Sequence, residues 1–383
     1  MRIGFFTDTY LPNVDGVVRA ILNFRGELQR RGNEVSVFAS GPKADEAANN
    51  DKSVYFYRSV KFPPYPQYKV ALFPYHASKV RAQETGVQLV HSHAIANMGL
   101  AAISTAKTLR LPLVGTFHTL VPKAVQILAK RKWSQKAGEA IAWKLIQAFY
   151  KPFDLVTAPS KIICGMLQEH GIENAVPVPN GIDLGRFNPN LDRKWARKPM
   201  GLAADEKLVL VAGRFSKEKN VEVVVKAFDR VLRNKKARLV ISGEGPAKQD
   251  VMSLVEKMGL QKQVTFLGFL PEHELPLYYA AADVFVTAST FETQGLTVLE
   301  SMGCGTPVVG ANSMAIPETL KDGENGRLFA PMDEEDCADK IEEILQLDAK
   351  GRERMRSEAR LTAQGYSIPK MTDVLLKAYA KVM

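Results

Sequence analysis

Short runs rich in branched apolar residues alternate with helical patterns along the whole sequence. In the first half these runs predict strands at residues 2–6, 34–40, 87–93, 113–119, 155–160 and 176–180. In the second half they predict strands at residues 207–214, 237–243, 263–269, 284–289, 307–312 and 326–330. Because the runs are continuously apolar, we expect strands covered on both faces, as in parallel sheets joined by helical crossovers. This pattern restricts the fold class to α/β.

The length of 383 residues exceeds what one core supports, so two domains are expected. Each half carries its own strand series, which predicts two Rossmann-like domains with parallel sheets facing across a deep cleft. We place the N-terminal domain at 1–181, a linker at 182–205, the C-terminal domain at 206–368 and a final helix at 369–383. Ligands of open parallel sheets bind beyond the carboxyl ends of the strands.

The net charge of +10 and the pI near 9.3 predict attraction to anionic partners. Charge alone leaves phosphorylated substrates, lipid headgroups and nucleic acid open, but no nucleic-acid recognition motif is present, so we expect no nucleic-acid partner. Three cysteines without a C-x-x-C pair are expected as reduced thiols in a reducing compartment. The N-terminus reads as a strand rather than a signal peptide, and the longest uncharged run is too short and broken to span a bilayer. These features indicate a cytoplasmic location.

The segment E-T-Q-G-L-T-V-L-E carries two acids, Glu292 and Glu300, on either side of a glycine that is expected to open a helix. The backbone N–H groups of Gly295, Leu296 and Thr297 would lie at that helix N-terminus, where unpaired donors and the helix dipole favour phosphate. Two carboxylates flanking a phosphate site suit a ligand with hydroxyls on both sides of a diphosphate. A nucleotide sugar is such a ligand.

Further candidates lie at the ends of other predicted strands. Arg214 and Lys219 are two cations that can neutralise a departing diphosphate, or a solvated basic turn. Gly243 can let a nucleotide approach the backbone, or can belong to an ordinary strand-to-helix turn. His118 ends a strand and can hydrogen-bond a sugar hydroxyl, or can be structural. Gly16 can bring phosphate to the N–H groups of the next helix.

Two observations argue against a bound metal. The sequence contains no Asp-x-Asp, the pattern expected where Mg²⁺ or Mn²⁺ holds a diphosphate. We also expect His91 and His93 to point to opposite faces of their strand, which would make them a poor metal pair. The sequence therefore predicts a metal-free site with no cofactor.

The segment from Lys123 to Lys151 holds seven Lys or Arg residues against one acid, Glu139. Aromatic and aliphatic residues are interleaved with these charges, which is typical of a basic helix in a membrane interface. We expect membrane contact at Lys130, Arg131, Lys132 and Trp133, with further aromatic anchors at Trp143, Phe149 and Tyr150. The alternative is a basic helix whose apolar face packs on its own domain.

Taken together, the motifs resemble the family 4 retaining glycosyltransferases of the GT-B fold over almost the whole chain. The matching segments are P-N-V-D-G, T-F-H-T, D-L-V-T-A-P-S, V-P-N-G-I-D, G-R-F-S-K-E-K-N and the Glu292–Glu300 pair. E-T-Q-G-L, where many members have E-G-F-G-L, is similar to the lipid glucosyltransferases. Thr293 and Gln294 are the residues that favour a lipid acceptor within this resemblance.

The resemblance implies roles for these residues. Glu300 would bind the nucleotide ribose, Arg214 and Lys219 the diphosphate, Glu292 the sugar hydroxyls and His118 the sugar near its 6-position. Gly16 would approach the phosphate from the N-terminal, acceptor-binding domain, and the base would lie near Gly243. In this family the departing phosphate is thought to accept the acceptor proton, so no general base is named.

The implied reaction moves a hexose, from UDP-glucose or UDP-galactose, with retention to a membrane lipid hydroxyl such as diacylglycerol. The partners would be the nucleoside diphosphate sugar, the lipid acceptor and the anionic surface of the cytoplasmic membrane face. Two alternatives stay open: a retaining transferase with a soluble or polysaccharide acceptor, and a nucleotide-sugar 2-epimerase.

Overall fold

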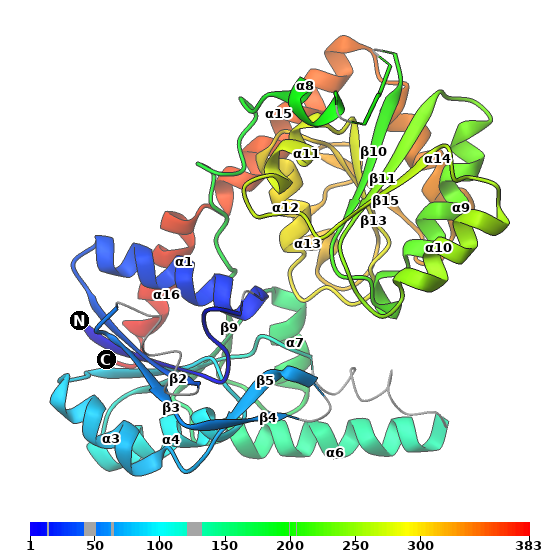
Figure 1. Ribbon diagram of the computed structural model, residues 1–383. Helices are drawn as coiled ribbons and strands as arrows, with labels where there is room; N and C mark the ends of the chain where they lie inside the picture. Colours follow the sequence, from blue (N-terminus) through cyan, green and yellow to red (C-terminus); the bar gives the residue numbers. More distant parts are fainter. Residues whose placement is uncertain (14, 42–50, 63–64, 121–131, 199, 204) are drawn as a thin grey trace. The chain divides into compact units, whose positions relative to one another are not determined.

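The computed structural model describes residues 1–383 apart from 14, 42–50, 63–64, 121–131, 199 and 204 (Figure 1). The chain divides into two compact units, which are treated separately below. The first comprises Met1–Gly181 together with Ile368–Met383, and the second comprises Ile182–Ser367. The segment 182–205 thus lies in the second unit, and the C-terminal helix lies in the first.

The described part of the first unit is built on a seven-stranded sheet in the order β3-β2-β1-β6-β7-β8-β9, and every pairing is parallel. The strands are β1 (Arg2–Thr7), β2 (Glu34–Ser40), β3 (Val54–Tyr57), β6 (Leu89–Ser92), β7 (Leu113–Thr116), β8 (Leu155–Ala158) and β9 (Ala175–Pro177). Strands β4 (Ser59–Phe62) and β5 (Tyr65–Ala71) form a separate antiparallel pair. The strand order reverses between β1 and β6, so the loops after these two strands leave in opposite directions.

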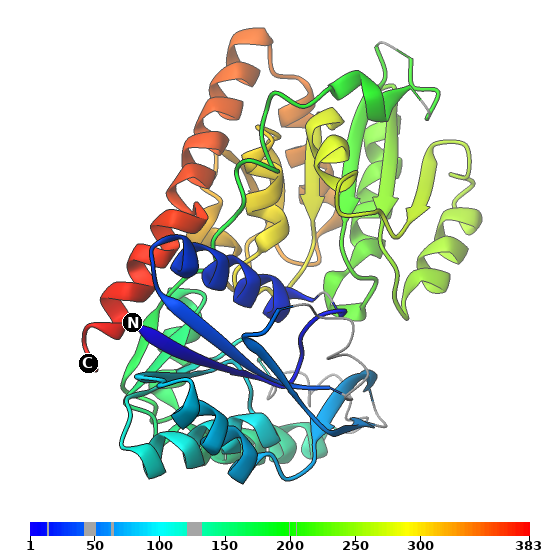
Figure 2. The same ribbon diagram turned by 60° about the vertical axis from the view of Figure 1, so that its left-hand side comes forward.

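Helices cover this sheet, and one of them comes from the far end of the chain. They are α1 (Gly16–Arg30), α3 (Tyr75–Glu84), α4 (Asn97–Leu109), α6 (Lys132–Tyr150), α7 (Lys161–Glu169) and α16 (Ile368–Tyr379). Figures 1 and 2 both show α16 beside α1, where Arg31 pairs with Asp373 and donates to the carbonyl of Pro369. Leu375 and Tyr379 of α16 are fully buried, so this helix completes the core of the first unit.

The described residues of the second unit form a six-stranded parallel sheet in the order β12-β11-β10-β13-β14-β15. The strands are β10 (Lys207–Ala212), β11 (Ala237–Ser242), β12 (Val264–Gly268), β13 (Val284–Thr287), β14 (Val308–Ala311) and β15 (Gly326–Phe329). The helices are α8 (Arg193–Arg197), the 3₁₀ turn η1 (Lys217–Lys219), α9 (Val221–Leu232), α10 (Lys248–Lys257), α11 (Leu275–Ala281), α12 (Leu296–Gly303), α13 (Ile316–Thr319), α14 (Glu334–Leu345) and α15 (Ala349–Gly365). Here the order reverses between β10 and β13.

Strand β10 shows why the apolar runs are continuous. Val209 and Val211 belong to one buried cluster, and Leu208 and Leu210 belong to a second cluster of the same unit. Successive side chains of a strand point to opposite faces, so a strand covered on both sides needs apolar residues at every position. Truncating Leu210, which is fully buried, to Ala is expected to cost about 2–5 kcal/mol.

All twelve strands expected from the sequence are present, with ends that differ by a few residues. The helix expected after the first strand is α1, and Gly32 follows it with a φ of 78°, a left-handed conformation that glycine adopts without strain. Strands β3, β4 and β5 were not predicted. β4 and β5 mix polar and apolar residues, so the continuous apolar signal is lost there, and β3 is an apolar run of only four residues.

Candidate functional site

The reversal point of the second sheet brings two sequence motifs together. The loop after β10 carries Arg214 and Lys219, and the loop after β13 carries Glu292, so both lie at the carboxyl ends of adjacent strands. Asn220 holds the loops together, because its side-chain amide donates to the carbonyl of Ala288 at 3.0 Å. The backbone N–H of Thr290 also donates to the carbonyl of Glu218 at 3.1 Å. A crevice at such a reversal point is the usual ligand site of an open parallel sheet.

Lys219 and Glu292 are in direct contact at this point. Lys219 Nζ lies 2.5 Å from Glu292 Oε1, and their side chains are 29% and 14% exposed. Burial raises the pKa of the Glu292 carboxyl, but the charge of Lys219 and hydrogen bonds from Lys219 and Ser289 outweigh burial and lower this pKa overall. Glu292 is therefore ionised at neutral pH, and it holds the ammonium group in one place. The sequence motifs suggested separate roles for the two residues but not this contact.

Arg214 differs from Lys219 in its surroundings. Its side chain is exposed, while the neighbouring Phe215 and Ser216 are buried. An exposed guanidinium keeps its conformational freedom until a ligand binds it. The Arg214 guanidinium is therefore accessible to an anionic ligand.

The glycine-rich loop after β11 packs backbone against backbone. Gly243 has a φ of 138°, and a Cβ added to it would lie 1.8 Å from the carbonyl oxygen of Gly213. Phe215 N–H donates to the carbonyl of Glu244 at 2.9 Å, which fixes the two loops side by side. Gly243 is thus required by the close approach of these loops, whatever else it contacts.

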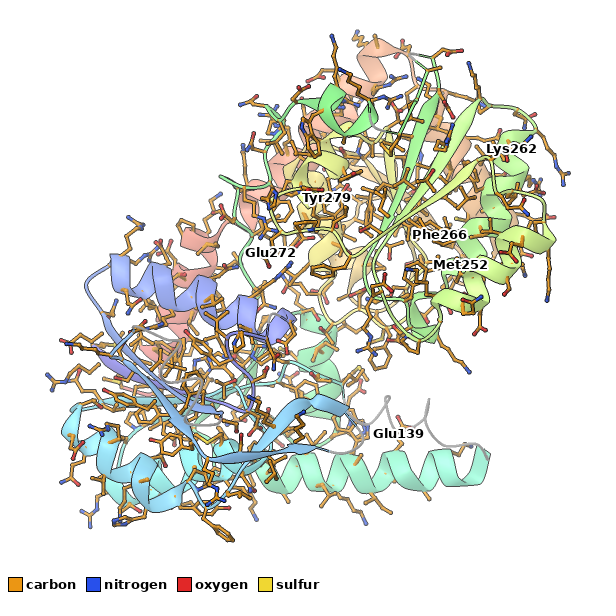
Figure 3. All side chains as sticks on the ribbon, viewed as in Figure 1. Glu139, Met252, Lys262, Phe266, Glu272 and Tyr279 are labelled. Atoms are coloured by element: carbon orange, nitrogen blue, oxygen red, sulfur yellow. The ribbon has the colours of Figure 1, made fainter. Side chains whose placement is uncertain are left out.

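Glu300 lies on α12, which begins where the sequence predicts. Gly295 precedes the helix in the left-handed conformation, with a φ of 81°, and the first intrahelical bonds are those of Val298 and Leu299 N–H to its carbonyl. The N–H groups of Leu296 and Thr297 are not used by the helix itself. Glu300 is buried, and the hydroxyl of Tyr279, labelled in Figure 3, donates to its Oε2 at 3.1 Å. Tyr279 thus orients one carboxylate oxygen.

The first unit has a comparable reversal point between β1 and β6. Asp8 follows β1, and its two carboxylate oxygens accept the backbone N–H groups of Ala96 and Met98 at the start of α4. Burial raises the pKa of Asp8 to about 6 against the effect of these hydrogen bonds. Gly16 is the first residue of α1 and is exposed, with no atom within 4 Å of an added Cβ. The N-terminus of α1 is therefore open at that residue.

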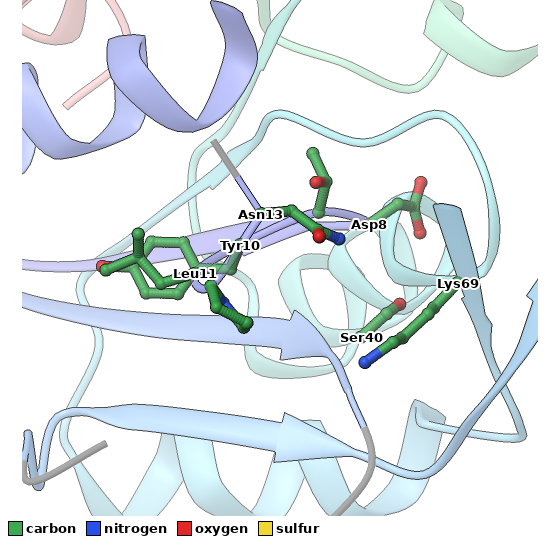
Figure 4. A pocket seen from close by; sticks show the side chains of 8 residues that line it. Asp8, Tyr10, Leu11, Asn13, Ser40 and Lys69 are labelled. Atoms are coloured by element: carbon green, nitrogen blue, oxygen red, sulfur yellow. The ribbon is translucent and has the colours of Figure 1, made fainter. Parts of the chain in front are cut away.

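A small pocket lies beside Asp8 (Figure 4). Asp8 and Asn13 from the loop after β1, Ser40 at the end of β2 and Lys69 on β5 line it, and its volume is about 30 Å³. This volume holds about one water molecule. The pocket therefore marks a polar recess at the carboxyl end of the sheet rather than a site for a whole sugar.

His118 lies just beyond β7, beside two other histidines. His118 Nε2 is 2.9 Å from His93 Nδ1, and the ring centroids of His91 and His93 are 4.1 Å apart. The expectation that His91 and His93 point to opposite faces was wrong, because residues two apart in a strand share a face. Burial lowers the pKa of His91 to about 3 and that of His118 to about 4, so these rings are neutral at physiological pH.

The basic segment divides its apolar residues between two faces. Lys130 and Arg131 lie outside the described residues, as do the side chains of Lys132 and Trp133 at the start of α6. Trp143 and Tyr150 are buried, so the expectation that they anchor a membrane was wrong. Trp143 stacks on His170, with ring centroids 3.8 Å apart, and the Tyr150 hydroxyl donates to the carbonyl of Thr116.

The opposite face of α6 is exposed and mixed in character. Ile141 and Leu145, one turn apart, are 59% and 66% exposed, and Lys136, Lys144 and Lys151 are exposed on the same helix or directly after it. Among the helices of the described chain, none is both long enough and apolar enough to cross a bilayer.

Comparison with known sequences agrees with the motifs. The profile of Glycosyltransferase Family 4 matches residues 14–186, and that of Glycosyl transferases group 1 matches residues 192–362. The chain is 33% identical over 352 residues to the alpha-monoglucosyldiacylglycerol synthase of Streptococcus pneumoniae, covering 90% of this chain and 78% of that protein. The chain belongs to the family 4 glycosyltransferases.

A second relative supports the family assignment, and a solved structure shows the fold. The alpha-monoglucosyldiacylglycerol synthase of Acholeplasma laidlawii is 30% identical over 346 residues, covering 86% of this chain and 85% of that one. The crystal structure of Anabaena HepE in complex with UDP superimposes with a TM-score of 0.78 over the full length of both chains, at 20% identity. The fold is therefore GT-B, and this glycosyltransferase has the two parallel-sheet α/β domains expected from its sequence.

Proposed function

We propose that this family 4 enzyme transfers a hexose from UDP-glucose or UDP-galactose to a membrane lipid hydroxyl such as that of diacylglycerol, with retention of the anomeric configuration. The observation that carries the proposal is the 33% identity, over 90% of the chain, to a protein described as an alpha-monoglucosyldiacylglycerol synthase. The 30% identity to a second protein of the same description supports it. UDP-bound structures of the same fold favour a uridine nucleotide.

In this proposal the second unit binds the donor through the residues at its reversal point. Glu300, held by Tyr279, accepts hydrogen bonds from the ribose hydroxyls, and the N–H groups of Gly295, Leu296 and Thr297 face the diphosphate. Lys219 and Arg214 stabilise the negative charge that accumulates as the sugar–phosphate bond breaks. Because Glu292 contacts Lys219, the ammonium group is already positioned before the reaction begins.

We propose that the first unit binds the acceptor. His118 would bind the sugar near its 6-position, and Gly16, at the exposed start of α1, would approach the phosphate. Charge neutralisation by Arg214, Lys219 and helix N–H groups removes the need for a metal ion, so we propose a metal-independent reaction. Both statements extend the resemblance of the sequence motifs to this chain.

We also propose that the enzyme attaches peripherally to the cytoplasmic face of the membrane through the exposed side of α6. Ile141 and Leu145 supply apolar area there, and the neighbouring lysines supply positive charge. Each Lys or Arg near an anionic surface contributes on the order of 1 kcal/mol, and Leu-sized side chains contribute by burial. We propose Lys130, Arg131, Lys132 and Trp133, which precede this face in the sequence, as further membrane contacts.

A product screen tests the proposal. UDP-glucose, UDP-galactose and GDP-mannose are each incubated with diacylglycerol in anionic vesicles, with soluble oligosaccharide and polyol acceptors, and with no acceptor, in the presence and absence of EDTA. An α-linked hexosyl lipid, identified by the anomeric coupling constant and formed equally with EDTA, is the expected product. Transfer to soluble acceptors alone would overturn the lipid assignment, and an epimerised nucleotide sugar without acceptor would overturn transfer itself.

A further inference from the structure

His93 is held beside His118, the residue proposed to bind the sugar. Its Nδ1 is 2.9 Å from His118 Nε2, and the two rings meet edge to edge with centroids 5.2 Å apart and planes 28° apart. Phe5 packs against His93 at 4.7 Å between centroids, and only 7% of His93 is exposed. His93 therefore cannot rotate away without opening the core of the first unit.

A hydrogen bond between two neutral imidazoles contains one proton, so either His93 or His118 donates it. The surroundings of the other His93 ring nitrogen, Nε2, decide which ring donates. His93 Nε2 is buried and has no hydrogen-bond partner among the described residues. If His118 donated, His93 would carry its own N–H on this Nε2, buried and unpaired. If His93 donates from Nδ1, only a lone pair is left there, and buried acceptors without partners are less costly than buried N–H groups.

The donation from His93 has a consequence for His118. A neutral ring whose Nε2 accepts a hydrogen bond must carry its proton on Nδ1. His118 Nδ1 has no partner within the described part of the chain, and His118 is partly exposed. We propose that His93 is a positioning residue that holds His118 in the tautomer protonated on Nδ1, so that His118 presents a fixed N–H donor to the hydroxyl oxygen of its ligand.

The third histidine has both ring nitrogens engaged elsewhere, so it does not compete. His91 Nδ1 is 2.7 Å from the hydroxyl of Tyr379, and its Nε2 is 2.6 Å from Thr116 Oγ1. Tyr379 is fully buried, so its hydroxyl hydrogen needs an acceptor. His91 Nδ1 provides one if the hydroxyl donates to it. His91 then carries its proton on Nε2 and donates to Thr116. Thr116 in turn donates to Thr157, whose hydroxyl donates to the carbonyl of Gly115.

The three rings therefore have an assigned pattern: a proton on Nε2 in His91, and on Nδ1 in His93 and His118. Burial keeps all three neutral, because it lowers the pKa of each ring below its ordinary value. The N–H of His118 is thus present throughout the physiological range. The inference rests on the proposed function only for the identity of the ligand, and the tautomer itself can be measured without any substrate.

The test combines a spectroscopic and a kinetic readout on the full-length protein. Long-range ¹H–¹⁵N correlation spectra of ¹⁵N-histidine-labelled protein distinguish the two tautomers, and single His→Gln variants assign the resonances. His93→Leu removes the donor, while His93→Asn places an amide N–H close to the former Nδ1. We expect His118 to be protonated on Nδ1 in the wild type and in His93→Asn, and to change to Nε2 in His93→Leu. The tautomer of His91, protonated on Nε2 in every folded variant, serves as the folding control.

With UDP-glucose and diacylglycerol vesicles, kcat should fall roughly 10- to 100-fold in His93→Leu with little change in KM, and recover in His93→Asn. A wild-type spectrum with His118 protonated on Nε2 overturns the inference even if His93→Leu does not fold. So does a His93→Leu enzyme with wild-type kcat. If the wild type transfers no sugar to lipid, the proposed function fails, and the spectra still decide the tautomer.

Discussion

Breaking the contact between Lys219 and Glu292 should weaken the second unit in a way that depends on pH. Glu292→Gln removes the charge, and Lys219→Met leaves a carboxylate that is only 14% exposed without its partner. Removing one partner of a fully buried pair costs about 3–5 kcal/mol, whereas exposed pairs are worth about 1 kcal/mol or less. Since Lys219 is 29% exposed, we expect an intermediate loss of about 2–3 kcal/mol for Lys219→Met and about 1–2 kcal/mol for Glu292→Gln.

The pH dependence distinguishes this ion pair from simple packing. The folded pKa of Glu292 is lowered, so its contribution is present above the unfolded value of about 4.3 and is lost as pH falls through the folded pKa. The difference in free energy of unfolding between wild type and Glu292→Gln should therefore shrink only below about pH 4.3. In Lys219→Met, both effects of Lys219 are lost and only the hydrogen bond from Ser289 still opposes burial, so the pKa of Glu292 rises. The difference in free energy of unfolding between wild type and Lys219→Met should already shrink as the pH is lowered from 7 toward 5.

The measurement must report the second unit alone. The chain has three tryptophans, of which only Trp195 lies in that unit, so ¹⁹F NMR of 5-fluorotryptophan-labelled protein follows its unfolding in urea. The double variant completes a thermodynamic cycle, and Lys226→Met, at an exposed ion pair with Glu334, is the matched control. A coupling energy below about 0.5 kcal/mol between Lys219 and Glu292 would refute the reasoning.

Three further outcomes are expected. Glu300→Ala should raise the Kd for UDP at least about tenfold by calorimetry. Tyr279→Phe keeps the ring but removes the hydroxyl that donates to Glu300 Oε2, so it should raise this Kd by a smaller factor; equal Kd values would contradict the ribose role. The double variant Ile141→Ser, Leu145→Ser should bind anionic vesicles roughly tenfold more weakly in a sedimentation assay, and so should a variant with Lys130, Arg131 and Lys132 neutralised. The control Leu361→Ser, at a residue 59% exposed on α15, should bind normally. Unchanged binding of the double variant would exclude the exposed face of α6 as the membrane contact. The first unit should lose stability as the pH falls below about 6.5, because the folded pKa of His91 is about 3 and that of His118 about 4. Chemical denaturation followed at Trp143 measures the free energy of unfolding at each pH. This free energy should fall less steeply with decreasing pH in His91→Asn than in the control His273→Gln, at an exposed residue.

The strands and the helix starts could be predicted because they depend on local pattern. The core of a strand such as β10 is continuously apolar because both of its faces are covered. A window of about six residues in the sequence is enough to reveal such a run. Gly295 marks the start of α12 because its left-handed conformation favours glycine. The same local reasoning fails for the β4–β5 pair, whose short strands mix polar and apolar residues without a regular pattern and stand outside the main sheet.

Contacts between distant segments could not be predicted from the sequence. Lys219 and Glu292 are 73 residues apart, and only the adjacency of β10 and β13 brings their loops together. The place of Trp143 depended on which face of α6 meets His170, a residue beyond the next strand. His91 and His93 are a different case, because the spacing of two residues was available and was assigned to the wrong faces.

The position of α16 bears on the order in which the protein can be made. The first unit contains the N-terminal residues, yet its core includes Leu375 and Tyr379, and the Tyr379 hydroxyl satisfies His91. During synthesis, the domain that leaves the ribosome first therefore waits for the second domain to be translated before its own interior is complete. Domains usually fold in the order in which they emerge. In this chain the second unit can finish folding before the first, which leaves the histidine cluster as one of the last parts of the enzyme to form.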